Sequence, residues 1–471
     1  MPLLPGRKWV RRLAIAAVIL VVGVVVVRTV LVGGLQSRLA GTIARIEADD
    51  PDWRLDKLIA ARNAALPPDD RNSFPLAAGV KAKLPATFDD RTTPLYEAMS
   101  RQPNALLRPE DLTALNKLLA ECGPALADAR KLATMPDGGQ PLVIPPNPMM
   151  INLTGSQDVR RAAGLLHLDA VAAANANKPA DAVRSARALL NAGRAIGDEP
   201  TLISQLVRVA CVAVAGRTVA EVLGLCEPTD TDGLAELHAE LLREADFRRL
   251  TVGFRGERAL SFQTFDWMMS NGPGAPAPTG IPILDPIARW GMRTYLPADQ
   301  LRCLELMTEF VAASKKPFEE QRAALAAVPR PGPNEWRYNL TRMMVPAVEK
   351  VAEAGLRSRG ELLAVATGVA AERYRRKHGA WPASLEALVP EFLPAVPLDP
   401  FTGRPLGFKP LPDGLVIYTV GPDGKDGGGQ VLDTPDGPRA TDYGIRLWTK
   451  DQRRQPPAPA PASPAPGGIA P

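Results

Sequence analysis

An uncharged apolar run close to the N-terminus constrains this chain more than any other feature. The run extends from Leu13 to Val27, LAIAAVILVVGVVVV, and resumes after Arg28 as far as Leu35. A helix needs about 20 apolar residues to cross a bilayer. Residues 13–35 reach that length if the Arg28 side chain extends towards the interface. The segment 13–35 therefore predicts a single transmembrane anchor.

The basic residues before this run predict its orientation. They are Arg7, Lys8, Arg11 and Arg12. Because positively charged flanks stay in the cytoplasm, we expect residues 1–12 to be cytoplasmic and the bulk of the chain to be extracytoplasmic (periplasmic), anchored in a bacterial inner membrane. A cleaved signal peptide has the same basic start and apolar centre. No convincing A-x-A site follows and no cysteine lies near Gly33 for lipidation, which favours the uncleaved anchor.

The composition of the remainder indicates a large helical domain. Of 471 residues, 46% are hydrophobic and 23% are charged, which is enough for a sizeable core. The formal net charge of +5 mixes both signs, so nucleic-acid binding has little electrostatic support. Apolar residues recur at helical spacing between Ser156 and Leu225. The fold class predicted is mainly α, with residues 36–359 forming either a bundle or a short helical-repeat-like array.

Several segments are expected to interrupt or end the helices. Asp49-Asp50-Pro51 should end a first helix, and residues 65–94 and 271–296 should be loops. A final long helix should extend from about residue 340 to residue 378. Short β-prone runs then replace the Ala-rich helices, which places a domain boundary near Gly360. Residues 447–471 are expected to be a disordered tail rich in proline and alanine.

Residues from Gly360 to Ile445 carry one specific resemblance. A helix ends in a basic turn that bears a tyrosine, followed by a G-x-W-P step, an L-x-x-L-V segment, a D-P-F-x-G turn, a strand and a Gly/Asp-rich loop. The residues concerned are Tyr374, Gly379, Trp381, Pro382, Leu385, Leu388, Val389, Asp399, Pro400, Phe401, Gly403, Tyr418, Gly421, Asp423, Gly424 and Gly427. This order resembles the globular domain of the type II secretion major pseudopilins. The resemblance implies that residues 360–446 form a small α+β domain.

The chain departs from that family at its N-terminal end. Pseudopilins begin with a short basic leader, a processed Gly-Phe junction and a glutamate early in the transmembrane helix. Here the first glutamate is Glu47, beyond the predicted span, and no such junction occurs. We therefore expect a large anchored protein that carries a pseudopilin-like module, rather than a processed, polymerising subunit.

The resemblance also implies a calcium site in the Gly/Asp-rich loop. The side-chain candidates are Asp423, Asp426, Asp433 and Asp436. Ca²⁺ takes six to eight oxygen ligands, which carboxylates and exposed loop carbonyls supply. The spacing is not that of an EF-hand, because no glutamate closes the loop. The alternative is a solvated loop in which aspartate and glycine only permit turns.

The most suggestive polar cluster of the helical region is Arg255-Gly256-Glu257-Arg258, expected at the start of a helix. A functional interpretation makes Glu257 a general acid or base whose pKa the arginines adjust. A structural interpretation, which we favour, pairs Glu257 with Arg208 or Arg194 across the bundle.

The histidines and cysteines give weaker indications. His167 is expected to be a satisfied interior histidine. His238, between two glutamates, is expected on a solvated helix face. The four cysteines form no C-x-x-C pair, and we expect them to be small buried hydrophobic residues.

These observations predict a membrane-anchored, non-catalytic envelope protein that acts in assembly or protein–protein contact, near a secretion system. Two alternatives stay open. One is an envelope hydrolase with a carboxylate and arginine site in the helical domain. The other is a helical-repeat protein that binds peptides in an apolar groove along residues 158–224.

Overall fold

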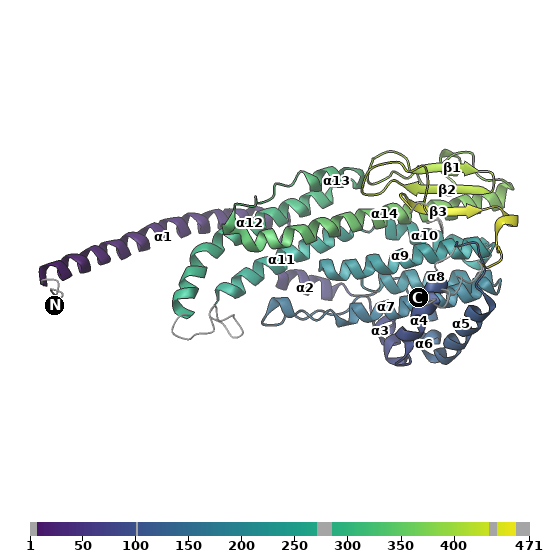
Figure 1. Cartoon of the computed structure of the whole chain (residues 1–471), viewed down its shortest axis with the longest axis horizontal. Coiled ribbons are helices and arrows are strands. Elements are labelled where there is room, and N and C mark those ends of the chain that lie inside the picture. The colour runs from purple at the N-terminus through teal and green to yellow at the C-terminus, as the bar shows by residue number, and fades with distance from the viewer. Residues whose placement is uncertain (1–6, 100–101, 271–284, 433–439, 458–471) are drawn as a thin grey trace, which may run out of the picture.

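The computed structural model describes residues 7–99, 102–270, 285–432 and 440–457. In these parts the chain is mainly helical and has a small antiparallel sheet near its C-terminal end (Figure 1). The helices before residue 200 are α1 (Arg7–Asp49), α2 (Leu55–Ala64), α3 (Ser73–Gly79), α4 (Phe88–Ala98), α5 (Pro109–Glu121), α6 (Gly123–Lys131), α7 (Thr154–Asn175) and α8 (Pro179–Arg194). The later ones are α9 (Leu202–Leu225), α10 (Leu234–Asp246), α11 (Arg249–Met269), α12 (Asp285–Lys315), α13 (Phe318–Ala326) and α14 (Asn339–His378).

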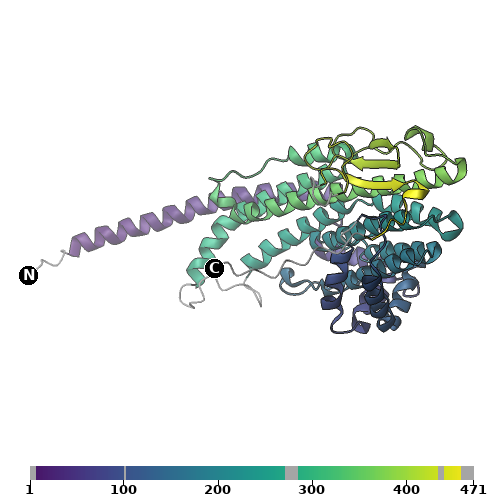
Figure 2. The same cartoon turned by 45° about the vertical axis from the view of Figure 1, so that its right-hand side comes forward.

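The first helix, α1, is 43 residues long, and its N-terminal part extends away from the rest of the molecule, the body (Figures 1 and 2). The valines and leucines between Leu13 and Leu31 are exposed. This helix is long and apolar enough to cross a membrane. It ends at Asp49, directly before Asp50-Pro51. The sequence prediction of one apolar N-terminal helix and of its end is thus confirmed.

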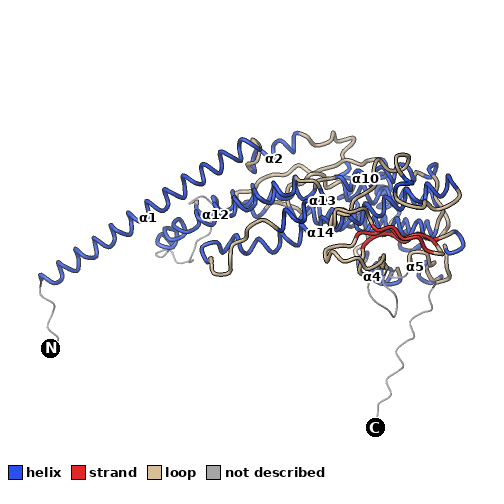
Figure 3. The backbone as a smooth tube through the Cα atoms, turned by 90° about the horizontal axis from the view of Figure 1, so that it is seen from above, coloured by secondary structure: helices blue, strands red, loops and turns tan. Residues whose placement is uncertain are grey.

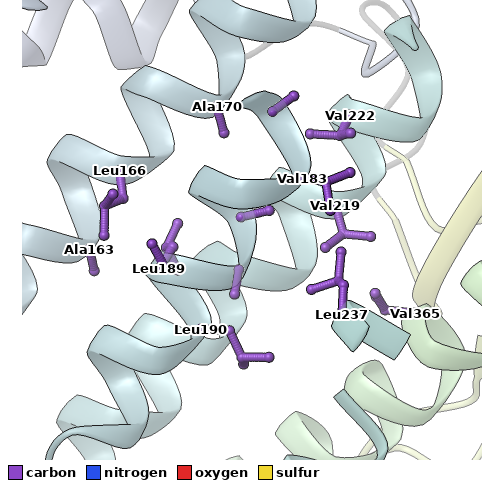
Figure 4. Close-up of a cluster of buried hydrophobic side chains, with 14 of the residues drawn as sticks. Ala163, Leu166, Ala170, Val183, Leu189, Leu190, Val219, Val222, Leu237 and Val365 are labelled. Atoms are coloured by element: carbon purple, nitrogen blue, oxygen red, sulfur yellow. The ribbon is translucent and has the colours of Figure 1, made fainter. Parts of the chain in front are cut away.

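The core of the body is formed by α7, α8 and α9, with α10 and α14 packed against them (Figure 4). Leu166, Leu189 and Val219 are almost wholly buried there. Alanines on the same helices let the backbones approach closely. The cluster continues through Leu362 of α14 to Ile445 of the sheet, so one hydrophobic core joins the bundle to the sheet.

The sheet has the order β1-β2-β3 and lies at the end of the body remote from the free end of α1 (Figure 3). Its strands are β1 (Gly407–Leu411), β2 (Gly414–Thr419) and β3 (Tyr443–Trp448). Both pairings are antiparallel, and Ile417 of β2 lies opposite Phe408 and Ile445. β2 is buried along its whole length, as its β-branched and aromatic residues favour.

The 40-residue helix α14 is shared by the bundle and the sheet. It ends as expected at Gly379, whose φ of 80° is in the left-handed region and whose N–H donates to the Arg375 carbonyl at 2.8 Å. The boundary expected near Gly360 falls inside this helix. A Cβ atom at Gly360 would lie 2.7 Å from the Thr419 side chain, so this glycine serves the close packing of β2 on α14.

The segment after β3 returns to the bundle. Arg454 donates to the carbonyls of Ala174 and Asn175 at the end of α7 and of Leu225 at the end of α9. Gln455 pairs with Ala105 in a parallel bridge. Residues 453–455, which lie within the expected tail 447–471, are therefore bound to the body, and residues 458–471 lie outside the described residues.

Two segments expected to be loops contain helices. Residues 65–94 include α3 and the start of α4. Residues 271–284 lie outside the described residues, but α12 begins at Asp285, well before the expected end of that loop at residue 296. Proline contributed to both errors, because α4 and α12 each contain an internal proline, Pro94 and Pro297.

The two helical histidines are both interior. His167 lies 2.8 Å from the Thr218 hydroxyl, as an interior histidine should. The prediction of a solvated face for His238 is wrong, because α10 packs against α8 and α14 and leaves His238 only 3% exposed. Its Nδ1 atom lies 3.3 Å from the Arg373 guanidinium. Burial, reinforced by Arg373, lowers the pKa of His238 to about 4.

We expect His238 to make stability fall as the pH decreases. The unfolded chain takes up this proton near pH 6.5 and the folded chain only near pH 4, so stability is lost between these values. The loss reaches about 3 kcal/mol at pH 4. Urea unfolding at pH 7, 6 and 5 should show a flatter profile for His238→Gln than for the native chain. Replacement of the exposed His378 by Gln is the control, and equal slopes for the two variants would contradict the prediction.

Candidate functional site

The carboxylates predicted for calcium lie only partly within the described residues. Asp423 and Asp426 are in the loop after β2, whereas Asp433 and Asp436 lie outside the described residues. The Asp423 carboxylate accepts from the Lys425 N–H at 3.1 Å. Asp426 accepts from the Gly428 N–H at 2.7 Å and from the Tyr418 hydroxyl at 2.9 Å. Among the described ranges no group of three or more potential metal ligands occurs.

A further aspartate, Asp442, holds this loop and was missed by the sequence analysis. Its two oxygens accept from the N–H groups of Gly427 and Gly429 at 3.0 and 2.8 Å. Burial, together with the hydrogen bond to Asp426, raises the pKa of Tyr418 to about 12. The described part of the loop is thus held by carboxylates that bind backbone amides. Calcium binding stays a prediction.

The Arg255-Gly256-Glu257-Arg258 cluster lies in the middle of α11, not at a helix start. A Cβ atom at Gly256 would lie 1.6 Å from the Pro200 carbonyl oxygen, so this glycine serves the close packing of α11 against the segment before α9. Glu257 accepts from the Leu202 N–H at 3.0 Å, at the N-terminus of α9. Burial raises the pKa of Glu257. The helix terminus stabilises this carboxylate, and the expected pairing with Arg208 or Arg194 is wrong.

The partner of Arg208 is instead Glu244 of α10. The Arg208 Nε and Nη2 atoms donate to the two Glu244 oxygens at 2.9 and 2.5 Å, and Nη1 donates to the Gly197 carbonyl at 2.8 Å. The guanidinium also lies 3.8 Å from the Phe247 ring centre. Sequence reasoning found the need for an acidic partner of Arg208 but not which acid provides it.

Two more arginines surround the same carboxylate. Arg249, at the start of α11, lies 3.0 Å from a Glu244 oxygen, and Arg194, at the end of α8, lies 3.7 Å from the other. Burial alone would raise the pKa of Glu244, but the arginines outweigh it and lower the pKa. One buried carboxylate thus faces three buried guanidinium groups, which leaves a surplus of positive charge.

This cluster forms one wall of an arginine-lined recess of about 280 Å³ between α8, α9 and α10. Its lining residues include Arg194, Arg208, Arg243, Glu244, Phe247, Asp137 and Asp198. The two aspartates are exposed and pair with arginines at the edge, Asp137 with Arg194 at 3.7 Å and Asp198 with Arg62 at 3.0 Å. The recess offers guanidinium donors to an acidic group. Glu244 is held by three arginines and is therefore a poor proton acceptor.

Comparison with known proteins identified no relative of this chain. No protein-family model, no curated protein and no solved structure matches the chain.

We expect Glu244→Gln to destabilise the chain more than Arg208→Met. The first change removes the one buried carboxylate that faces three buried guanidinium groups, which costs about 3–5 kcal/mol. The second leaves Glu244 paired with Arg249 and Arg194. The double variant should be more stable than the sum of the single losses implies, because a shared interaction is removed only once. Urea unfolding of the full chain in detergent measures all three.

Arg243→Met provides the matched control, because Arg243 lines the same recess but is exposed. It should change the free energy of unfolding by less than about 0.5 kcal/mol. Equal free energies of unfolding for Glu244→Gln and Arg243→Met would show that the buried arginines do not depend on the Glu244 carboxylate.

Proposed function

We propose that this chain is a membrane-anchored extracytoplasmic protein that acts through protein contacts in the cell envelope. In this proposal α1 spans the inner membrane and holds the helical body at a fixed position above it. The observation that carries the proposal is the continuity of α1, which passes as one helix from the exposed apolar stretch into the packed body.

The end of α1 is fixed to α11 by a buried ion-pair group. The Asp50 carboxylate accepts from Arg255 at 2.9 and 2.7 Å and from Arg258 at 2.5 Å. Burial would raise the pKa of Asp50, but the two arginines outweigh it and lower the pKa. Breaking a buried pair leaves an uncompensated charge, so this group resists movement of the body about the anchor.

Apolar contacts reinforce the same junction. Trp53 is wholly buried and meets the Phe262 ring edge-on, with 5.1 Å between ring centres. Ile46 of α1 packs in the same cluster, which also includes Leu304 of α12. A chain whose only task was attachment could use a flexible linker. The packed junction supports a role in which the orientation of the body matters.

The arginine-lined recess supports contact with an acidic group of a partner. Two buried guanidinium groups, those of Arg194 and Arg208, lie beside one buried carboxylate, Glu244, and Arg208 is held in place by Glu244 and the Gly197 carbonyl. Arginine in a fixed position suits the two oxygens of a carboxylate. Glu257, the acid of the hydrolase alternative, is not among the residues that line this recess, which favours the binding role.

The anchored topology predicts which side of the membrane Met149 occupies. Met149 is 68% exposed, whereas all four native cysteines are buried. Met149→Cys in the full chain should therefore react with a membrane-impermeant maleimide when only the outer membrane of the host cell is opened. The chain should also stay with the membrane after carbonate extraction. Reaction only after the inner membrane is broken, or release by carbonate, would contradict the proposal.

Calcium binding by the loop after β2 is a separate part of the proposal, suggested by the resemblance of that segment to pseudopilins. Extracytoplasmic modules bind calcium at about 10⁻⁴–10⁻³ M. A concentration of about ten times Kd should stabilise the folded chain by about 1.4 kcal/mol. The full chain should thus melt at a higher temperature in calcium than in chelator, and Asp423→Asn should remove the difference. Equal melting temperatures would show that the loop is held by Asp442 and its backbone contacts alone.

A further inference from the structure

The adjoining ends of α11 and α12 form a surface rich in aromatic, methionine and arginine side chains. We name it the helix-end surface and define it by Trp267, Met269, Trp290, Met292, Arg293 and Tyr295. Trp290 and Tyr295 are 45% and 44% exposed. Figures 1 and 2 show both helix ends extending out of the body on the side from which α1 extends. Large exposed aromatic residues at such a position require an explanation.

Contacts with α1 fix the level of this surface along the anchor. The Arg28 Nε atom donates to the Thr294 hydroxyl at 2.8 Å, and the Arg28 guanidinium lies 5.0 Å from the Trp290 ring centre. Further along, Arg38 lies 3.5 Å from Glu305. The two helices therefore run in the same direction with matched positions, and Trp290 and Thr294 lie level with Arg28.

The level of Arg28 and Trp290 lies at the membrane whether the transmembrane segment ends at Val27 or at Leu35. If the span ends at Val27, Arg28 lies at the interface, and Trp290 lies there with it. If the span extends to Leu35, Arg28 lies about 10 Å below its end, at 1.5 Å per residue. Trp290, which is level with Arg28, then lies at the same depth below that end. In both cases the exposed rings of Trp290 and Tyr295 meet the lipid headgroups or the adjoining acyl chains.

The chemistry of the surface suits that environment. Tryptophan and tyrosine favour the membrane–water interface, where an apolar ring and a polar atom are both accommodated. The last carbonyls of α11 would otherwise lack partners near lipid. Arg293 donates to the Met269 carbonyl at 3.0 Å, and Arg289 donates to the Ser270 carbonyl at 3.3 Å. The same exposed Arg293 can approach headgroup phosphates.

We propose that the helix-end surface inserts into the lipid interface and gives the protein a second membrane contact beside α1. The proposal rests on the proposed function, because it requires α1 to span the bilayer. With two contacts the body cannot rotate about the axis of α1. The occupant of this surface is thus a lipid interface and not a second protein.

Single nitroxide labels on the full chain test this proposal. The chain is reconstituted into vesicles of phosphatidylcholine and phosphatidylglycerol, and labels are placed by Trp290→Cys, Val22→Cys and Met149→Cys. Met149 is the water-exposed control, because the neighbouring Leu142 and Ile151 pack with α2, beyond the end of α1. Accessibility to oxygen, which concentrates in lipid, is compared with accessibility to a water-soluble nickel chelate.

We expect the oxygen-to-nickel ratio at position 290 to exceed that at position 149 several-fold and to lie below that at position 22. Tyr295→Cys should give the same result as Trp290→Cys, which controls for local disturbance by either change.

Three results would overturn the proposal. A ratio at positions 290 and 295 equal to that at position 149, with position 22 in lipid, would reject the interfacial contact and leave the anchor intact. Water exposure at position 22 would reject the anchor itself and the contact with it. Protection of position 290 from both reagents, with spin–spin broadening, would show that a second copy of the chain covers the surface.

Discussion

The buried ion pair between Glu372 and Arg453 holds together parts of the chain that are far apart in sequence. Glu372 of α14 is wholly buried and lies 2.8 Å from the Arg453 guanidinium. Arg453 also donates to the carbonyls of Cys226, after α9, and Trp448, at the end of β3. Charges buried in this way are costly unless every donor finds an acceptor. The pair therefore forms only when the bundle, α14 and the sheet are in place together, and the hydrophobic core that runs through all three brings them into this arrangement.

Sequence reasoning succeeded where local chemistry decides the structure. The apolar run of α1, its end before Pro51 and the helix end at Gly379 all follow from single residues and their neighbours. It failed where packing decides. The cluster that contains Gly256 was expected at the start of a helix, yet Gly256 lies inside α11 and serves a close contact with Pro200. A glycine needed for backbone conformation and one needed for space are indistinguishable in a single sequence.

The same limit applies to the candidate site. The position of Arg208 on an apolar helix predicted a buried acidic partner, and such a partner exists. Its identity could not be predicted, because Glu244 and Glu257 lie on neighbouring helices and only the arrangement of these helices in space distinguishes them. Asp442 was missed for a related reason. Asp442 comes well after the loop in the sequence. It reaches the loop amides only because β3 returns beside β2.

The contact between the segment after β3 and residues 104–106 has a consequence for biosynthesis. The Asn104 side chain donates to the Gln452 carbonyl across 348 residues of chain, beside the bridge between Ala105 and Gln455. During vectorial synthesis Asn104 is made long before Gln452, so this contact cannot form until 348 further residues have been added. Contacts at such separations slow folding, and unfinished domains expose apolar surface in the meantime. The contacts of residues 104–106 therefore form only after the segment that follows β3 has been synthesised.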